Sequence, residues 1–325
     1  MRIVIFGAGA VGGVLAVRLA SAGEDVAIVA RGPHLEAIRS SGLRFTAADE
    51  DLTVELAATD DAAALGQADL VISTLKAQAL PSAATALAGL LAPGGRLVIA
   101  ANGLPWWFFH GFGGPHEGRR LALLDPDDAL WRQVGPERVL GGVVYMRAEV
   151  VAPGHVHWFG GERLVLGEPG GGMTAALAAA APCLSRAGFT VEATDRIRDA
   201  VWDKLQGNAA SNPISVLIGG TMTDLVGDTA LADVLARVMT EVHAVGTAFG
   251  ARFTKSVPER MAGMRGFGAF KTSMLQDFER GRSLEIDAIL GSVVELGRIA
   301  GVATPTIDML LALISAKARL VGLPR

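Results

Sequence analysis

The sequence predicts an α/β protein in which an N-terminal parallel sheet wound with helices is followed by an all-α C-terminal domain. From the N-terminus to residue 101, short apolar runs rich in β-branched residues alternate with helical segments. A β-rich stretch with Gly and Pro turns begins near residue 141 and predicts an antiparallel extension of the sheet. Beyond residue 195 the strand pattern disappears. A chain of 325 residues has room for about two domains, so we place them at residues 1–194 and 195–325.

The first strands are the best defined elements. Residues 2–6 (RIVIF) and 25–30 (DVAIVA) predict buried strands, separated by a glycine-rich turn and an apolar helix that ends at Gly23. A strand, a helix and a second strand in about 30 residues form the crossover unit of a parallel sheet. Further strands are predicted at 68–75 and 95–101, with an alanine-rich helix around 78–90 between them. Residues 173–187 then predict a helix, and residues 189–194 a short strand.

The C-terminal half predicts helices separated by glycines or prolines. They cover residues 196–211, 228–249, 285–300 and 306–319. We expect Pro213 to bend or end the first of them, because proline lacks a backbone N–H. Ser283 is a plausible N-cap of the third, which would place Glu285 in the first helical turn.

The bulk composition excludes several classes of partner. The formal net charge is −4 without any basic block, which argues against nucleic acid. Half the residues are hydrophobic, but charged residues interrupt every apolar stretch before about 18 residues, so no membrane span or signal peptide is predicted. The single cysteine, Cys183, is interpreted as a small core residue and fits a reducing compartment. We therefore expect a cytoplasmic protein. The pair His155-x-His157 lacks a third ligand nearby, so no metal site is predicted.

The first turn carries the glycine pattern Gly7-x-Gly9-x-x-Gly12 between a strand and a helix. In a Rossmann-type dinucleotide site the first glycine permits the tight turn, the second lets the backbone approach a pyrophosphate, and the third lets helix and strand pack closely. The free N–H groups at the start of the helix bind the phosphates. The predicted cofactor-binding residues of this turn are Gly7, Ala8, Gly9, Ala10, Val11 and Gly12.

Arg31 indicates which dinucleotide is bound. Sites specific for NAD place an acidic residue at the end of the second strand, but this strand ends in Val29-Ala30-Arg31. A guanidinium suits the 2′-phosphate of NADP, so NADPH is the expected cofactor.

A row of polar side chains marks the first C-terminal helix. Lys204, Asn208 and Asn212 are successive i, i+4 neighbours and lie on one stripe. From spacing alone, a catalytic stripe and a merely solvated face are equally good interpretations.

The wider run around this stripe resembles a family signature. Trp202-x-Lys204-Leu205-x-x-Asn208-x-x-x-Asn212-Pro213 is similar to the catalytic helix of the ketopantoate reductases. Three further matches follow the family's order: Thr74-Leu75-Lys76, Asn102-Gly103, and Ser273 to Asp277 leading to Glu285-Ile286-Asp287. With the N-terminal glycines, the resemblance covers nearly the whole chain.

The resemblance implies an NADPH-dependent reductase of the 2-oxo acid ketopantoate, an enzyme of pantothenate synthesis. It makes Lys204 the general acid that protonates the ketone oxygen, with Asn102 and Asn208 positioning that lysine or the oxygen. It further implies that Asn212 and Ser273 bind the substrate carboxylate region and that Glu285 accepts a hydrogen bond from the substrate hydroxyl. It places Lys76 and Arg31 near the adenosine phosphate or ribose of the cofactor. Asn102 would also contact the cofactor. Structural interpretations remain for two of these residues, because a carboxylate such as Glu285 is favoured in a first helical turn and Ser273 could simply begin a helix.

One departure leaves the substrate open. After Asn102-Gly103 the chain reads Leu104 to His110 with four aromatic residues, Trp106 to Phe109, where the family has small residues. These rings could line a substrate pocket or anchor a longer loop, and the sequence favours neither. The alternatives are therefore an NADP-dependent reductase of a different 2-oxo acid, a β-hydroxyacid or opine-type dehydrogenase, and a non-catalytic NADP(H) sensor. The apolar helix faces are compatible with a homodimer.

Overall fold

The computed structural model describes residues 1–323, apart from the side chain of Phe267. The chain forms two compact units. The sheet unit comprises Met1–Ala101, Trp106–Arg120 and Asp125–Ile197, and the helical unit comprises Asn102–Pro105, Leu121–Leu124 and the chain from Arg198 onward. Two short segments of the loop after residue 101 therefore belong to the helical unit, although they precede it in sequence.

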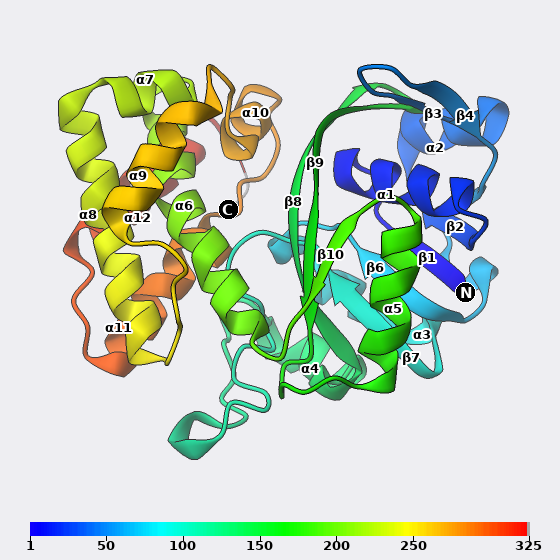
Figure 1. Ribbon diagram of the computed structural model, residues 1–325, viewed down its shortest axis with the longest axis horizontal. Helices are drawn as coiled ribbons and strands as arrows, with labels where there is room; N and C mark the ends of the chain where they lie inside the picture. The colour runs from blue at the N-terminus through cyan, green and yellow to red at the C-terminus, as the bar shows by residue number, and fades with distance from the viewer. Residues whose placement is uncertain (324–325) are drawn as a thin grey trace. The chain divides into compact units, whose positions relative to one another are not determined.

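The centre of the sheet unit is a run of parallel strands (Figure 1). These strands are β1 (Arg2–Phe6), β2 (Asp25–Val29), β6 (Ala68–Ser73) and β7 (Leu91–Ile99). β1 pairs in parallel with β2 on one side and with β6 on the other. The strand order therefore reverses direction at β1, and in open α/β sheets ligands bind beyond the carboxyl ends of the strands at such a point.

The antiparallel extension is built on two long strands, β8 (Val139–Ala152) and β9 (His155–Gly167), which run side by side in Figure 1. The remaining strands, β3 (Leu43–Thr46), β4 (Asp51–Val54), β5 (Ala57–Thr59) and β10 (Thr190–Ala193), complete a ten-stranded sheet. Its path runs β4-β3-β9-β8-β7-β6-β1-β2-β5, with β10 paired to β9. The parallel sheet with an antiparallel extension is confirmed.

Helices cover both faces of this sheet. They are α1 (Ala10–Ser21), α2 (Gly32–Ser41), α3 (Ala84–Leu90), α4 (Ala129–Gln133) and α5 (Ala175–Arg186). Ile3 and Ile5 belong to a core cluster with side chains of α1 and α5. Val4 points to the opposite face and is also fully buried, as expected for a doubly wound sheet. Cys183 lies in the same cluster, and burial raises the pKa of its thiol to about 11, so it is the core residue that the sequence predicted.

The aromatic run after Leu104 is buried inside the sheet unit. Trp106, Trp107, Phe108 and Phe109 are at most 2% exposed. The rings of Phe108 and Phe109 meet edge to face at 5.0 Å, and Trp107 packs so closely on Gly141 that a Cβ there would lie 2.8 Å from the indole. These side chains therefore anchor the loop rather than line an open pocket.

The helical unit is all-α in the residues that the structure describes (Figure 1). Its helices are α6 (Ile197–Ile218), α7 (Met222–Gly227), α8 (Thr229–Ala248), α9 (Val257–Met264), α10 (Ser273–Glu279), α11 (Ser292–Ala300) and α12 (Pro305–Leu320). A π-helix, Asp287–Gly291, precedes α11.

Three local expectations are corrected. α6 does not end at Pro213 but continues to Ile218, because a proline removes only one intrahelical hydrogen bond. Ser283 does not cap the next helix, which begins at Ile286, so Glu285 lies just before its first turn. The helix expected around 78–90 consists of two 3₁₀ turns, followed by α3 from Ala84.

The close packing around Gly246 in α8 predicts that an added side chain there destabilises the helical unit. A Cβ at Gly246 would lie 2.8 Å from the Phe253 ring and 3.0 Å from the indole of Trp202. We expect Gly246→Ala to lower the free energy of unfolding by about 1–3 kcal/mol, the usual cost of overpacking a core. The matched control is Gly227→Ala in α7, where no atom of the described residues lies within 4 Å of the added carbon. Urea unfolding followed by tryptophan fluorescence measures both, and equal midpoints would contradict the packing argument.

Candidate functional site

The turn between β1 and α1 has the conformation of a phosphate-binding turn. Gly7 has φ +104°, a backbone conformation that strains any residue with a side chain. The Gly7 N–H donates to the Val29 carbonyl at 3.0 Å, and the hydroxyl of Thr74 donates to the Gly7 carbonyl. Hydrogen bonds from the ends of both neighbouring strands therefore fix the turn.

The other two glycines differ sharply in their surroundings. A Cβ at Gly12 would collide with the Gly7 carbonyl oxygen and lie 2.6 Å from the Thr74 hydroxyl, so this position needs glycine for packing. A Cβ at Gly9 would meet no atom of the described residues within 4 Å. Gly9 is also the N-cap of α1 and offers no side chain to its first N–H groups. The turn thus combines open space with exposed backbone donors, which fits the pyrophosphate of a dinucleotide.

Arg31 and Lys76 lie at the same edge of the sheet as this turn. Arg31 follows β2 and is exposed at the N-cap of α2, and Lys76 follows β6 and is half-buried at the N-cap of a 3₁₀ turn. Because β2 and β6 flank β1 in parallel, all three carboxyl ends meet at one edge. Arg31, Lys76 and the glycine turn are therefore brought together within the sheet unit, whereas Asn102, which was also predicted to contact the cofactor, belongs to the helical unit.

Sequence reasoning missed His34, which braces this turn. Its Nδ1 accepts the Gly154 N–H at 2.9 Å, so the ring proton of the neutral imidazole is on Nε2. Burial lowers the pKa of His34, and the nearby Ala8 backbone opposes that shift. His34 therefore links the glycine turn to the hairpin between β8 and β9. Its position in α2 carries no sequence signal for this contact.

In the helical unit, three predicted site residues form one hydrogen-bonded chain. The Nδ2 of Asn208, on α6, donates to Oδ1 of Asn102 at 3.4 Å. The Nδ2 of Asn102 donates in turn to Oε2 of Glu285 at 2.9 Å. Glu285 is only 9% exposed, so this hydrogen bond solvates a carboxylate that has lost most of its water.

The loop that carries Asn102 is fixed by the π-helix beside Glu285. Gly103 has φ +88°, and a Cβ there would collide with the backbone of Ala288. The Leu104 N–H donates to the Ala288 carbonyl at 2.8 Å, and the Ser292 hydroxyl donates to the same oxygen at 2.7 Å. One backbone carbonyl therefore sets the register between Asn102 and Glu285. Such widened helical turns are frequent at functional sites.

Lys204 interacts electrostatically with this cluster. Burial lowers the pKa of Lys204 from 10.5 to about 8, and the nearby Glu285 carboxylate opposes that shift. The ammonium is therefore the major form at neutral pH but loses its proton far more readily than an exposed lysine. A group with these properties can donate a proton near physiological pH.

Asn212 and Ser273 lie farther along the same elements. Asn212 is 4% exposed, and its Nδ2 is buried with no partner among the described residues. Ser273 is the exposed first residue of α10, whose N-cap Thr272 shares a 2.6 Å hydrogen bond with Ser215 of α6. The stripe on α6 is half-buried or buried, which excludes the solvated-face interpretation.

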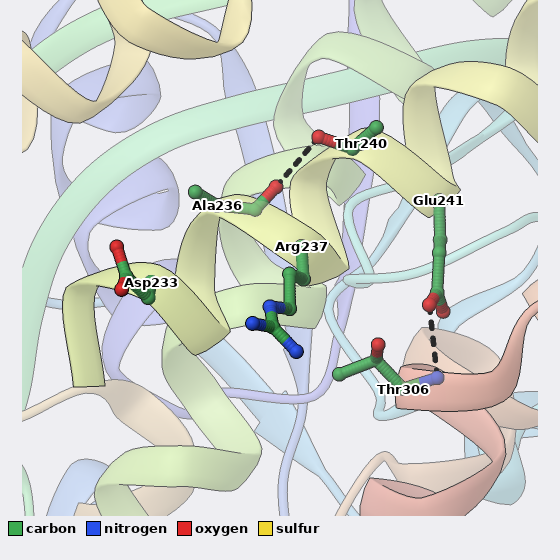
Figure 2. A pocket seen from close by; sticks show the side chains of 6 residues that line it. All are labelled: Asp233, Ala236, Arg237, Thr240, Glu241 and Thr306. Atoms are coloured by element: carbon green, nitrogen blue, oxygen red, sulfur yellow. Dashed lines mark hydrogen bonds between the residues drawn. The ribbon is translucent and has the colours of Figure 1, made fainter. Parts of the chain in front are cut away.

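A separate hollow lies along α8 at the start of α12, and Figure 2 shows its six lining residues. Its polar groups serve the fold: the Glu241 carboxylate accepts the N–H groups of Thr306 and Ile307 at 2.9 Å, and the Thr240 hydroxyl donates to the Ala236 carbonyl. It contains none of the predicted site residues.

Two further findings concern membranes and metals. Within residues 1–323 no helix combines the length and apolar character needed to cross a bilayer. His155 and His157 both hydrogen-bond the Thr46 hydroxyl, at 2.9 and 2.8 Å, and no group of three or more potential metal ligands occurs among the described residues.

Comparisons with known proteins agree with this arrangement. Residues 3–171 match the family model of ketopantoate reductase PanE/ApbA, and residues 196–318 match that of its C-terminal domain. The chain is 46% identical to a 2-dehydropantoate 2-reductase of Mesorhizobium japonicum over 97% of both proteins. A ketopantoate reductase candidate from Ralstonia solanacearum MolK2 has a crystal structure with a TM-score of 0.94, 44% identity and 99% coverage of both chains. The 2-dehydropantoate 2-reductase of Geobacter metallireducens GS-15 has a TM-score of 0.86 and 29% identity over 98% of this chain and all of its own. The chain belongs to the ketopantoate reductase family.

Proposed function

We propose that this protein reduces 2-dehydropantoate (ketopantoate) to pantoate with NADPH, a step of pantothenate biosynthesis. The observation that carries the proposal is the half-buried Lys204, whose pKa is lowered to about 8 and whose ammonium interacts with a carboxylate held by Asn102. Reduction of a ketone places negative charge on its oxygen, and a cationic proton donor at that oxygen stabilises the charge and then neutralises it.

The cofactor site supports NADPH. Gly7 to Gly12 offer the pyrophosphate a turn with room at Gly9, and Arg31 offers the 2′-phosphate a guanidinium where NAD-specific sites have a carboxylate. Lys76 and Asn102 are the other cofactor contacts that we propose. When bound, the nicotinamide supplies the hydride; the protein supplies orientation, charge and the proton.

The helical unit supplies the substrate contacts. Lys204 donates its proton to the ketone oxygen, and Asn208 and Asn102 fix the positions of Lys204 and that oxygen. Glu285 keeps the lysine protonated at neutral pH and accepts a hydrogen bond from the substrate hydroxyl. The buried Nδ2 of Asn212 and the exposed hydroxyl of Ser273 are the donors that we assign to the carboxylate region.

The competing functions explain these features less well. A non-catalytic NADP(H) sensor does not need a lysine of lowered pKa, because binding a nucleotide requires no proton donor. A reductase of a different 2-oxo acid would use the same groups. Burial of the four aromatic rings from Trp106 to Phe109 removes the sequence feature that pointed to a different acid.

The remaining parts of the proposal concern partners and location. A small anionic 2-oxo acid is the expected partner, rather than nucleic acid, on a chain of net charge −4. A homodimer is supported by exposed apolar side chains on one face of α12, where Met309 is 54%, Leu313 50% and Leu320 87% exposed. A cytoplasmic location agrees with a single buried cysteine in the chain.

The direct test is oxidation of NADPH with ketopantoate and a panel of other 2-oxo acids, followed by absorbance at about 340 nm, where reduced nicotinamide cofactors absorb. We expect ketopantoate to give the highest kcat/KM, and NADPH to exceed NADH as the donor. The Arg31→Asp variant should narrow or reverse the cofactor preference. A higher kcat/KM with another acid would reassign the substrate, and binding of NADPH without turnover of any acid would favour the sensor.

Gly9 and Gly12 generate a paired prediction, because their surroundings differ. We expect Gly9→Ala to leave the melting temperature unchanged but to weaken NADPH binding at least about tenfold, or 1.4 kcal/mol, because its methyl group occupies the space for the pyrophosphate. We expect Gly12→Ala to lower the melting temperature as well, because its methyl group collides with Gly7. Thermal unfolding and fluorescence titration with NADPH separate the two effects. Similar melting temperatures for both variants would contradict the assignment.

Lys204 generates a prediction about pH. The donor must be protonated, so kcat should fall as the pH rises through about 8. Lys204→Ala should lower kcat by about 10²- to 10⁴-fold with unchanged affinity for NADPH. Lys204→Arg should abolish the fall of kcat near pH 8, whatever the rate of this variant, because arginine stays protonated. Glu285→Gln should move the inflection to lower pH, since the carboxylate raises the pKa of Lys204. An unchanged inflection in Lys204→Arg would show that another group titrates.

A further inference from the structure

Gly207 is a glycine in the middle of a long helix without a packing reason. It is the eleventh residue of the 22 in α6, three residues after Lys204 and directly before Asn208. Glycine in a helix interior lowers stability relative to alanine, so its presence there calls for a cause.

Two other helical glycines of this unit have such a cause, unlike Gly227 at the end of α7 and Gly263 near the end of α9, whose Cβ positions are open. A Cβ at Gly246 would lie 2.8 Å from the Phe253 ring, and one at Gly297 would lie 2.8 Å from the Val302 carbonyl oxygen. At Gly207 no described atom outside its chain neighbours and its own stretch of helix backbone lies within 4 Å of the Cβ position, although the residue itself is half-buried. Alanine would therefore fit Gly207 without collision.

The open side of Gly207 faces the turn of α6 that carries Lys204. Each Cα–Cβ bond of a helix tilts toward its N-terminus, so a methyl group at 207 would lean back over the turn that carries Lys204. Residues three apart on a helix are surface neighbours at about 5–6 Å between Cβ positions. The space over Gly207 thus adjoins that of Lys204, and Asn208 follows directly in sequence.

We propose that Gly207 determines substrate size, by leaving room for the branched, fully substituted carbon next to the ketone of the 2-oxo acid. This inference rests on the proposed function, in which Lys204 meets the ketone oxygen. The carbon next to the ketone is then the nearest other part of the substrate. A glycine presents no polar side chain, so its open side accommodates an alkyl group without leaving a donor or acceptor unpaired.

The variant that tests the proposal is Gly207→Ala, which adds one methyl group and favours the helix. The control is Gly227→Ala, an equally uncrowded helical glycine in α7. The substrates are ketopantoate and 3-methyl-2-oxobutanoate as branched acids, and pyruvate as an unbranched one. Thermal unfolding, NADPH affinity by fluorescence titration, and pantoate affinity by calorimetry in the presence of NADP⁺ complete the measurements.

We expect Gly207→Ala to lower kcat/KM for the branched acids and the affinity for pantoate by at least about tenfold, the effect of one methylene in a substrate pocket. Turnover of pyruvate, NADPH affinity and the melting temperature should equal or exceed those of the parent protein. Gly227→Ala should change none of these quantities.

Three outcomes would overturn the inference. Equal losses for branched and unbranched acids would indicate a general disturbance of the helix, and no loss would show that the space is not used. A loss confined to NADPH affinity would assign the space to the cofactor. The proposed function is tested separately, by the turnover of ketopantoate by the parent protein. If the parent prefers a different acid, the role of Gly207 is still decided by whether Gly207→Ala lowers kcat/KM more for branched acids than for unbranched acids.

Discussion

The Ala288 carbonyl oxygen accepts hydrogen bonds from the Leu104 N–H and the Ser292 hydroxyl. These two donors come from parts of the chain that are far apart in sequence. The first fixes the loop that begins at Asn102, and the second belongs to the helix that follows Glu285. The Leu104 hydrogen bond joins the loop of Asn102 to the helix after Glu285, and the Asn102 amide donates to the Glu285 carboxylate at 2.9 Å. A backbone contact therefore helps to position the carboxylate that acts on Lys204.

Burying the charged groups of the site, which gives Lys204 its lowered pKa, reduces the stability of the fold. Burial of Lys204 disfavours its ammonium, and a buried carboxylate such as Glu285 needs hydrogen bonds to offset lost hydration. Gly103 and Gly207 also lower the stability of the fold, because glycine loses more conformational entropy on folding than other residues do. Departures of this kind from the most stable sequence concentrate at functional sites. Here they fall on three elements of the helical unit and leave its packed interior, around Gly246 and Trp202, unaffected.

In the glycine turn of the sheet unit, different glycines serve the fold and the ligand. Gly7 and Gly12 serve the local fold, the first through its positive φ and the second through close packing. Gly9 alone leaves space for a ligand. His34 on the neighbouring helix accepts a hydrogen bond from the hairpin of the antiparallel extension.

Features that depend on local spacing follow from the amino-acid pattern alone. Alternating apolar runs predicted the parallel strands, the glycine spacing predicted the dinucleotide turn, and the 3.6-residue period placed Lys204, Asn208 and Asn212 on one stripe. Family motifs then added Asn102, Ser273 and Glu285, and their roles remain predictions. Periodicity and spacing predict such features because they arise between residues close together in the chain.

Features that depend on contacts between residues far apart in the chain emerge only in the folded protein. Helix α6 continues through Pro213 to Ile218, and the helix after Ser283 begins only at Ile286, with Glu285 directly before it bound to Asn102. The aromatic run is buried because Trp131 packs edge to face on Trp106 and Gly141 packs closely on Trp107. Burial also sets the pKa of Lys204. Hydrogen-bond partners, burial and pKa are properties of the folded environment, which local sequence patterns do not encode.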